Sequence, residues 1–298
     1  MPVWAWLLTA AGVILAAAVV YWLLVVSEGA FLGSGTVTAL YNRVARRYDS
    51  IKQFDDADEA YFLGRPVARY LAGLPATPDL PWLLDVASGT GRLPLAVLRA
   101  SAGGCRVVAL DRADAMLAEA QRKLDKQGWP GVVYLAHHAA RLPFADEQFA
   151  VVTCLEALEF MPEPAAVLAE LLRVARPGGL LVLTNRIGRD ARLMLGRTFT
   201  RDGLSATLRS LGATGVEIMP WQMDYDLVYA VKQGQPTAGE SGDWSDKLQC
   251  PSCGARPLLQ VSAARQEQWA CPDCDWRLVG SDSFWRYDGY TRGSHRGR

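Results

Sequence analysis

The pattern of apolar and polar positions divides the chain into segments of different kinds. Residues 3–26 form an apolar run without any charge, in which Tyr21 has the only ionisable side chain. From residue 36 to residue 232, short apolar runs alternate with segments of helical periodicity. Residues 233–246 are rich in Gly, Ser, Thr and Pro, and two pairs of cysteines follow them. The pattern predicts a hydrophobic helix, an α/β domain, a linker and a small final unit.

The apolar run is long enough to cross a membrane as a helix. At about 1.5 Å per residue, its length matches a hydrocarbon core of roughly 30 Å. Trp4 and Trp6 lie near one end, and Tyr21 and Trp22 near the other, where aromatic rings favour the membrane interface. A cleaved signal peptide is disfavoured, because a basic first region and a small-x-small cleavage site are both missing. A buried helix would need a groove that hides every face. We therefore expect residues 1–27 to be a transmembrane anchor.

Arginine residues indicate the orientation of this predicted anchor. No Lys or Arg precedes the apolar run, whereas Arg43, Arg46 and Arg47 follow within about 20 residues of its end. The positive-inside rule therefore predicts a single-pass protein whose remaining domains are cytoplasmic. The same arginines lie in a predicted amphipathic helix, residues 36–48, and either contact anionic headgroups or form a solvated face. Residues 28–81 are thus expected to be N-terminal helices.

Seven short apolar runs predict the strands of an α/β domain over residues 82–232. Helical segments separate the first five runs, which favours a doubly wound, Rossmann-like and mostly parallel sheet. The last two runs are close in sequence and are expected to pair antiparallel. The predicted strands are residues 82–86, 106–110, 132–135, 149–154, 180–184, 216–221 and 225–232. The basic, poorly periodic residues 186–201 are expected to form a lid or a substrate-side insertion.

The first predicted strand passes directly into the loop Asp85-Val-Ala-Ser-Gly-Thr-Gly91 and then into a helix. A strand, a tight turn and a helix N-terminus together can hold a nucleotide-like cofactor, and glycine lets the backbone approach it. The second strand leads into Asp111, 20 residues after Gly91, where an acidic residue binds ribose hydroxyls in doubly wound folds. Pro94 stands where the dinucleotide fingerprint has its third Gly or Ala, which disfavours a nicotinamide-dependent dehydrogenase.

The cysteines near the C-terminus have the spacing of a metal site. Cys250-Pro-Ser-Cys253 and Cys271-Pro-Asp-Cys274 are separated by 17 residues, which matches a four-thiolate zinc site built from two tight turns. Such a site leaves no open coordination position, so we expect structural zinc that makes this small unit fold. Residues 247–290 are predicted to be a zinc ribbon, and residues 291–298 a disordered basic tail.

Composition narrows the function classes. The 31 basic and 31 acidic residues give a net charge of zero, so nucleic-acid binding is not indicated by the chain as a whole. Half of the 298 residues are hydrophobic, enough for one α/β domain and a smaller unit. Cys105 and Cys154 fall in or beside predicted strands and are expected to be buried.

Residues 41–232 resemble the class I S-adenosylmethionine-dependent methyltransferases, especially the quinone-biosynthesis type. Four motifs carry the resemblance, in the order and spacing of the family: the loop at residues 85–91, Leu110-Asp-Arg-Ala-Asp-Ala-Met-Leu117, Leu142-Pro-Phe144 with the following strand, and Arg176-Pro-Gly-Gly179. Residues 41–49 resemble the helix that closes over the cofactor. The cysteine-containing segment resembles zinc-ribbon domains found beside or fused to methyltransferases.

The resemblance implies S-adenosylmethionine as cofactor and a role for individual residues. Asp85 would organise the loop and the ammonium end of the cofactor, and Asp111 would bind the ribose. The remaining cofactor contacts would come from Ala87, Ser88, Gly89 and Gly91 in the loop and from Arg112 and Met116 near the adenine. Two positions depart from the family. His138 replaces a frequent adenine-contacting Asp and either contacts the adenine edge or is a surface histidine, and Ala150 replaces the usual Asp after the strand-four Phe.

Methyl transfer from a sulfonium is an in-line displacement, so positioning and desolvation supply much of the acceleration. A base is needed only when the acceptor keeps its proton. Glu156 directly follows the fourth strand and is the expected candidate, provided that its pKa is raised; the alternative is an exposed helix-cap carboxylate. His137, Glu159 and Asn185 are further candidates.

The expected function is that of a membrane-anchored methyltransferase that acts on a lipophilic small molecule such as a quinone, an isoprenoid or a lipid. Two alternatives stay open. One is a non-catalytic adaptor that presents the zinc ribbon to a protein or RNA partner. The other is a methyltransferase of protein or RNA.

Overall fold

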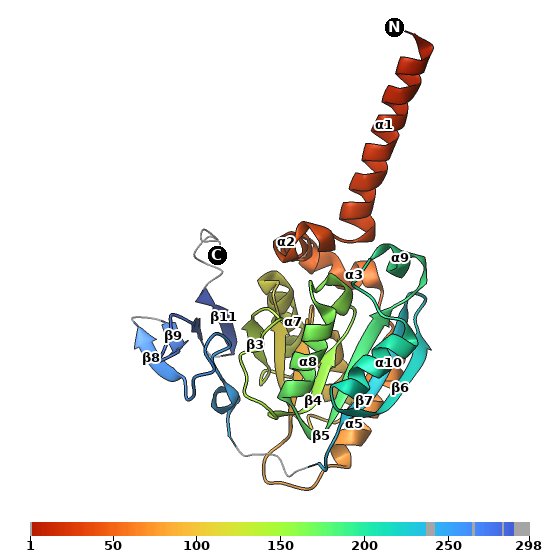
Figure 1. Ribbon diagram of the computed structural model, residues 1–298. Helices are drawn as coiled ribbons and strands as arrows, with labels where there is room; N and C mark the ends of the chain where they lie inside the picture. The colour runs from red at the N-terminus through yellow and green to blue at the C-terminus, as the bar shows by residue number, and fades with distance from the viewer. Residues whose placement is uncertain (1, 237–241, 264–265, 282, 289–298) are drawn as a thin grey trace.

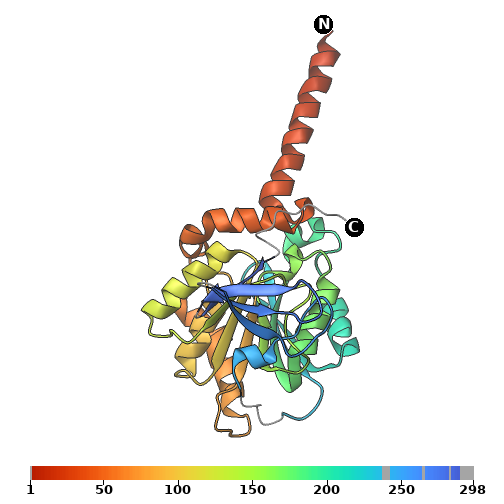
Figure 2. The same ribbon diagram turned by 90° about the vertical axis from the view of Figure 1, so that its left-hand side faces the viewer.

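The computed structural model describes residues 2–236, 242–263, 266–281 and 283–288 (Figure 1). The predicted tail, residues 291–298, and the middle of the predicted linker, residues 237–241, lie outside the described residues. An apolar helix projects from an α/β body, and a small β-unit from the C-terminal part of the chain lies against one side of that body (Figures 1 and 2).

The projecting helix covers the whole apolar run. Helix α1 (Val3–Tyr21) continues as a π-helical segment, η1 (Trp22–Val26), and neither contains a buried residue. Among the described residues, this is the one helix that is long and apolar enough to cross a membrane. Its apolar surface is therefore available to a bilayer rather than to the protein core.

Short helical elements connect the projecting helix to the first strand. They are η2 (Ala30–Leu32), α2 (Ser34–Val44), η3 (Ala45–Arg47), α3 (Tyr48–Lys52), α4 (Asp56–Glu59), η4 (Ala60–Gly64) and α5 (Arg65–Ala72). Between α4 and α5 the chain makes the π-helical turn η4, which ends at Gly64. A Cβ atom at Gly64 would lie 2.5 Å from the Ala96 carbonyl oxygen, so glycine allows this turn to pack closely on α6 (Arg92–Ala100).

One mixed sheet runs through the molecule. Its first seven strands are β1 (Trp82–Val86), β2 (Arg106–Asp111), β3 (Val133–Ala136), β4 (Phe149–Cys154), β5 (Ala175–Arg186), β6 (Ala213–Trp221) and β7 (Tyr225–Lys232). Strands β1 to β5 are parallel, and β7 pairs antiparallel with both β5 and β6. The predicted α/β class, the parallel strands and the antiparallel final pair are confirmed.

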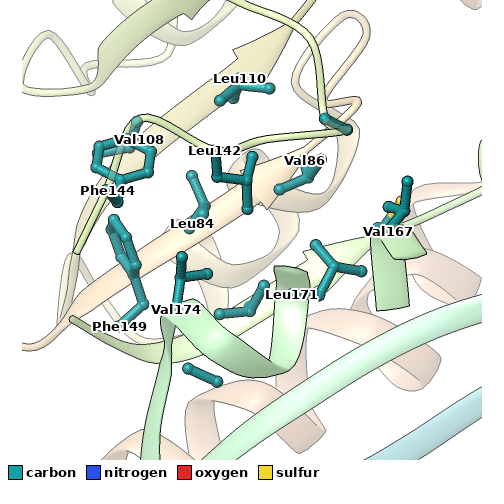
Figure 3. Close-up of a cluster of buried hydrophobic side chains, with 14 of the residues drawn as sticks. Leu84, Val86, Val108, Leu110, Leu142, Phe144, Phe149, Val167, Leu171 and Val174 are labelled. Atoms are coloured by element: carbon teal, nitrogen blue, oxygen red, sulfur yellow. The ribbon is translucent and has the colours of Figure 1, made fainter. Parts of the chain in front are cut away.

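Helices cover both faces of the sheet. Helices α5, α6 and α7 (Asp114–Lys126) pack on one face, and α8 (Pro164–Val174) and α10 (Arg201–Ser210) pack on the other. Figure 3 shows part of the second core, where Leu84, Leu110 and Phe144 lie with side chains of α8. Strands β1 and β4 have no exposed residue, as continuous apolar runs in a doubly covered sheet require. Cys105 and Cys154 are buried, as predicted.

The C-terminal unit extends the same sheet. It contains η6 (Trp244–Lys247), β8 (Leu259–Ala263), β9 (Gln266–Ala270), β10 (Arg277–Ser281) and β11 (Phe284–Tyr287). Strand β11 pairs parallel with β3, with Trp285 opposite Leu135, and the full order is β6-β7-β5-β4-β1-β2-β3-β11-β10-β9-β8. The prediction of a seven-stranded sheet is therefore corrected to eleven strands in the described part of the chain. The physical reason is that β3 would otherwise be an edge strand with unpaired backbone groups.

The segment after β5 is partly helical. Helix α9 (Gly188–Leu193) lies at the end of the body from which the apolar helix projects (Figure 1). The Asn185 side chain donates a hydrogen bond to the Phe199 carbonyl (3.0 Å) and accepts one from the Phe199 N–H (3.2 Å). Asn185 therefore closes the base of this segment, and a structural role accounts for its amide.

Candidate cofactor site and metal centre

The glycine-containing loop makes a tight turn between β1 and α6. Ala87, Gly89 and Gly91 have φ values of 56°, 53° and 74°, in the left-handed region that favours glycine. A Cβ atom at Gly91 would come within 3.0 Å of Leu124 and 3.1 Å of Ala120. Glycine at position 91 therefore suits both the left-handed backbone conformation and the close packing on α7.

Asp111 connects the end of β2 to this loop. Its two carboxylate oxygens accept hydrogen bonds of 2.8 Å from the N–H groups of Gly89 and Ala113. Burial raises the pKa of Asp111 above its usual range, against the effect of these backbone hydrogen bonds. A carboxylate has about four lone-pair sites, so Asp111 can still accept hydrogen bonds from a ligand. Asp111 can therefore hold the loop through these backbone hydrogen bonds and also bind ribose hydroxyls.

A cavity of about 310 Å³ lies at the carboxyl ends of β1, β2 and β4. Seven of the predicted site residues line it: Ala87, Gly89, Asp111, Arg112, Met116, His138 and Glu156. Asp85 and Ser88 do not line this cavity but a small recess beside it, and Gly91 lines neither. A larger hollow of about 560 Å³ lies around α4, α6 and α7. It contains none of the predicted cofactor residues, so the smaller cavity is the better cofactor site.

Asp85 lies beneath the loop. Its carboxylate accepts a 2.5 Å hydrogen bond from the Thr153 hydroxyl. Burial raises the pKa of Asp85 to about 6, although hydrogen bonding to the carboxylate opposes this shift. Ser88 is also buried, and its N–H donates to the Leu110 carbonyl at 3.0 Å. Both residues therefore support the loop from below.

Helix α2 covers the cavity from the side of the apolar helix. Val37, Thr38 and Tyr41 of this helix and Tyr48 of α3 line the cavity. The Tyr41 hydroxyl donates a 2.8 Å hydrogen bond to Glu28, which fixes the helix to the chain directly after the predicted anchor. The resemblance indicated this closing helix, but the sequence pattern alone did not indicate which of its side chains point to the cofactor.

Glu156 does not have the environment of a general base. Its carboxylate forms ion pairs of 2.6 Å with Arg92 and 2.7 Å with Lys52. Burial alone would raise its pKa, but Arg92 and Lys52 outweigh burial and lower the pKa. The raised pKa that a base would need is therefore not found. The alternative of an exposed helix-cap carboxylate is also not met, because the Glu156 side chain is only 6 % exposed.

Sequence reasoning missed Arg92, which connects three parts of the site. Its guanidinium pairs with Glu59 (2.6 Å) as well as with Glu156, and it lies 4.1 Å from the centre of the Phe54 ring. These partners come from different elements, so no local motif could have indicated them. Arg92 ties the N-terminal helices to the rim of the cavity.

Two histidines form the side of the cavity next to the C-terminal unit. Burial lowers the pKa of His137 to about 3 and also lowers the pKa of His138, so both are neutral at pH 7. The Nδ1 atom of His138 is buried without a hydrogen-bond partner among the described residues. The ring of Tyr287 lies 5.4 Å from that of His137 and 6.5 Å from that of His138. The predicted surface alternative for His138 is therefore not supported.

The four predicted metal ligands are brought together. The Sγ atoms of Cys250, Cys253, Cys271 and Cys274 lie within 4.8 Å of one another. Sγ atoms of a tetrahedral four-thiolate zinc site are expected about 3.8 Å apart, from a Zn–S distance of about 2.3 Å. The observed Sγ–Sγ distances include 3.5 Å for Cys250 and Cys274 and 3.3 Å for Cys253 and Cys271. The donor set and its size are compatible with zinc.

The fold, the loop and Asp111 define the region from β1 to β5 as a class I S-adenosylmethionine-dependent methyltransferase domain. Residues 84–183 match a family model described as a methyltransferase domain. A demethylmenaquinone methyltransferase from Renibacterium salmoninarum is 35% identical over 147 residues, which cover 49% of this chain and 57% of the relative. A phosphatidylethanolamine N-methyltransferase from Cereibacter sphaeroides is 37% identical over 110 residues, 36% of this chain and 52% of the relative. The chain thus spans little more than half the length of these relatives.

Solved structures support the fold. The match to the crystal structure of the [4+2]-cyclase SpnF covers 67% of this chain and 97% of the SpnF chain, with a TM-score of 0.51 and 20% sequence identity. At this identity the likeness concerns the fold alone. A protein named as a cyclase has this fold, so the reaction must be argued from the site.

Proposed function

We propose that the chain is a membrane-anchored S-adenosylmethionine-dependent methyltransferase that methylates a lipophilic small molecule of the quinone, isoprenoid or lipid class. One observation carries this proposal. The cavity that contains the predicted cofactor residues is covered by α2, which follows closely after the apolar helix. The names of the two relatives, which act on demethylmenaquinone and phosphatidylethanolamine, support an acceptor that is found in membranes.

In this proposal the cofactor lies along the loop. Gly89 offers its backbone surface to the methionine and ribose parts, and Asp111 accepts hydrogen bonds from the ribose. Met116 and Arg112 border the adenine, and the unpartnered Nδ1 of His138 is available for a hydrogen bond with the adenine edge. Asp85 supports the ammonium end from below the loop. Gly91 serves through its packing on α7 rather than through contact.

S-adenosylmethionine supplies a methyl group on a positively charged sulfur. The sulfur–methyl bond would break as the acceptor–methyl bond forms, with S-adenosylhomocysteine as the leaving group, and the proton of an acceptor that carries one would pass to water. The chain's residues contribute orientation and exclusion of water, through the covering helix α2 and the apolar rim at Val37, Phe160 and Met161. We assign no base to Glu156, because its carboxylate is held by two cations. An acceptor whose hydroxyl ionises readily, such as the phenolic hydroxyl of a hydroquinone, needs no strong protein base.

In this proposal the apolar helix crosses the membrane, and the arginines that follow it in α2 and η3 support a cytoplasmic location of the domains by the positive-inside rule. Zinc bound by the four cysteines is structural, because the thiolates fill a tetrahedral coordination shell. A protein partner could still bind the ribbon without changing these assignments.

The test begins with cofactor binding. Calorimetry of the full chain in detergent should show binding of S-adenosylmethionine and none of NAD. Replacement Asp111→Asn should weaken binding roughly tenfold, since one backbone donor and the ribose lose a charged acceptor. Asp125→Asn, an exposed change on α7, is the matched control and should leave binding unchanged. No binding of either cofactor would favour an adaptor.

Acceptor class is tested separately. Native membranes are incubated with the protein and a radiolabelled methyl donor, and the products are separated into organic and aqueous phases. We expect the label in the organic phase. Label found only in protein or RNA would reject the lipophilic acceptor and support the alternative enzyme.

A further inference from the structure

The segment between β5 and α10 is attached to the base of the apolar helix. The Arg197 guanidinium donates a hydrogen bond to the Ala30 carbonyl (3.3 Å) and lies 5.2 Å from the centre of the Phe31 ring. The Phe31 ring in turn stacks on Trp22, with 5.0 Å between the ring centres. Trp22 begins the last, π-helical part of the apolar helix. The position of this segment relative to the apolar helix is therefore fixed by direct contacts (Figures 1 and 2).

The segment exposes an unusual combination of side chains. Leu193 and Leu195 are 49 % and 78 % exposed, whereas Ala191 and Met194 beside them are buried. Ala191 and Met194 thus supply the buried contact of the segment with the body, whereas Leu195 and half of the Leu193 surface face outward. Exposed leucines this close together mark a surface that contacts something apolar.

Basic side chains accompany these leucines. Arg189 and Arg192 of α9 are exposed, and the acidic residue between them, Asp190, lies 3.6 Å from Arg186. The outward charge of the helix is therefore positive. Leucines that can enter the headgroup boundary, together with arginines that extend to anionic headgroups, are the composition of an interfacial membrane contact.

We propose that residues 188–196 are a second membrane contact, which rests on the same bilayer that the apolar helix crosses. This inference depends on the anchoring in the proposed function and adds an anionic lipid surface as the partner of α9. Continuity with the base of the apolar helix decides for lipid over a protein partner, because the exposed leucines lie where the chain leaves the membrane.

A second contact matters because one helix does not orient a domain. Gly29 and Gly33, with φ values of 77° and 97°, lie between the apolar helix and α2, so the chain turns sharply at this junction. With both the apolar helix and α9 on the membrane, the domain is held at two points. The end of the body that carries α2 and the cavity below it then faces the bilayer, and a lipophilic acceptor reaches the cavity without crossing bulk water.

Lipid-depth quenching tests this contact directly. Full-length zinc-loaded protein is inserted into nanodiscs that contain anionic lipid and nitroxide-labelled lipid, after a fluorophore is attached to Leu193→Cys. The matched control is Leu259→Cys in β8, whose native leucine is 51 % exposed, close to the value for Leu193. The wild-type chain treated with the same reagent gives the background from native cysteines. We expect quenching at position 193 to exceed that at position 259 by at least about twofold; equal quenching would overturn the inference.

Two further measurements separate this inference from the proposed function. Exchanging anionic for zwitterionic lipid should reduce quenching at position 193. The double change Arg189→Gln and Arg192→Gln should remove this dependence on lipid charge. Quenching that changes with neither the lipid nor the arginines would reject the role of the arginines.

The double change Leu193→Ser and Leu195→Ser should raise the KM for a bilayer-embedded acceptor several-fold while leaving S-adenosylmethionine affinity unchanged. If position 193 is quenched but no lipid is methylated, the membrane contact stands and the proposed acceptor fails. If lipid is methylated but position 193 is not quenched, the proposed acceptor stands and the membrane contact fails.

Discussion

The two walls of the cofactor cavity are built in different ways. The loop wall consists of Ala87, Gly89 and Asp111, and a hydrogen bond from the Gly89 N–H to the Asp111 carboxylate holds it together. The ribbon wall consists of His137 and His138, against which Tyr287 packs from the far end of the chain. One wall is complete within a single strand–loop–helix–strand unit. The other needs the cysteine-containing unit about 150 positions later in the sequence.

The two walls therefore differ in what stabilises them. The loop wall folds with the sheet, since β1 and β2 are central strands and are fully paired. The ribbon wall depends on strand β11, whose own unit is too small for a core of its own. In the proposed function the ribbon gains stability from zinc on the four thiolates. It also gains stability from Trp244, Trp276 and Trp285, which belong to the same buried cluster as β1 and β4. We therefore expect that damage to the ribbon reaches the cofactor, whereas damage to the loop leaves the ribbon intact.

The largest expected effect comes from removing a metal ligand. In Cys271→Ser three thiolates remain, and a structural zinc site of this kind contributes on the order of 10 kcal/mol to folding of its unit. We expect loss of the zinc, loss of β8 to β11, and an S-adenosylmethionine affinity reduced because His137 and His138 lose their aromatic neighbours. Metal analysis and calorimetry on the full chain measure both.

The control for this variant is Cys105→Ala, which changes a buried cysteine outside the ribbon. It should keep its zinc and its cofactor affinity. A Cys271→Ser protein that loses zinc but binds the cofactor as tightly as wild type would show that the two walls are independent. It would contradict the expectation that damage to the ribbon reaches the cofactor site.

A second variant separates docking from metal binding. Trp285 is 2 % exposed and lies in β11 at the junction with β3. Trp285→Ala should cost about 3–5 kcal/mol while the four cysteines still bind zinc. Chemical unfolding with metal analysis should therefore show an unchanged zinc content and a lower stability. Trp129→Ala, a partly buried tryptophan outside the ribbon, should not alter protease sensitivity of the ribbon, whereas Trp285→Ala should increase it.

The loop wall could be predicted from the sequence, because its determinants are local. The apolar runs of β1 and β4 are buried on both faces, and the glycines and Asp111 stand at fixed offsets from them. The candidate metal ligands of the ribbon were equally predictable, since two Cys-x-x-Cys pairs at this spacing are typical of a four-thiolate zinc site. The pairing of β11 with β3 was not predictable, because a four-residue strand carries no information about which edge it will join.

The ion pairs of the rim were missed for a related reason. Arg92 meets Glu59 and Glu156 only after three separate elements have packed together. The sequence placed Glu156 correctly beside the cavity, but the sign of its pKa shift depends on cations that come from elsewhere in the chain. Position follows from the strand order, whereas electrostatic environment follows from tertiary contacts.

The pH dependence of the loop wall provides a smaller effect. Burial raises the pKa of Asp85 from 3.8 to about 6, so the folded protein binds more protons than the unfolded chain between these values. The free energy of unfolding therefore falls as the pH rises through this window, by roughly 1.4 kcal/mol from pH 5 to pH 7 for this one group. In Asp85→Asn this contribution is absent. Urea unfolding without cofactor should show the difference between wild type and variant shrinking or reversing toward pH 7, and a constant difference would contradict the shift.

The smallest effect is expected for a surface ion pair between the ribbon and the methyltransferase domain. Arg286 of β11 forms a 2.8 Å ion pair with Asp114 at the start of α7, and the two side chains are 40 % and 38 % exposed. Solvent screens such a pair, so a double-mutant cycle with Arg286→Ala and Asp114→Ala should give a coupling energy of about 0.2–1 kcal/mol. Added salt should reduce it further. If the coupling instead matched the cost of Trp285→Ala, charge rather than burial would hold the ribbon to the domain, and the ribbon wall would depend on ionic strength as the loop wall does not.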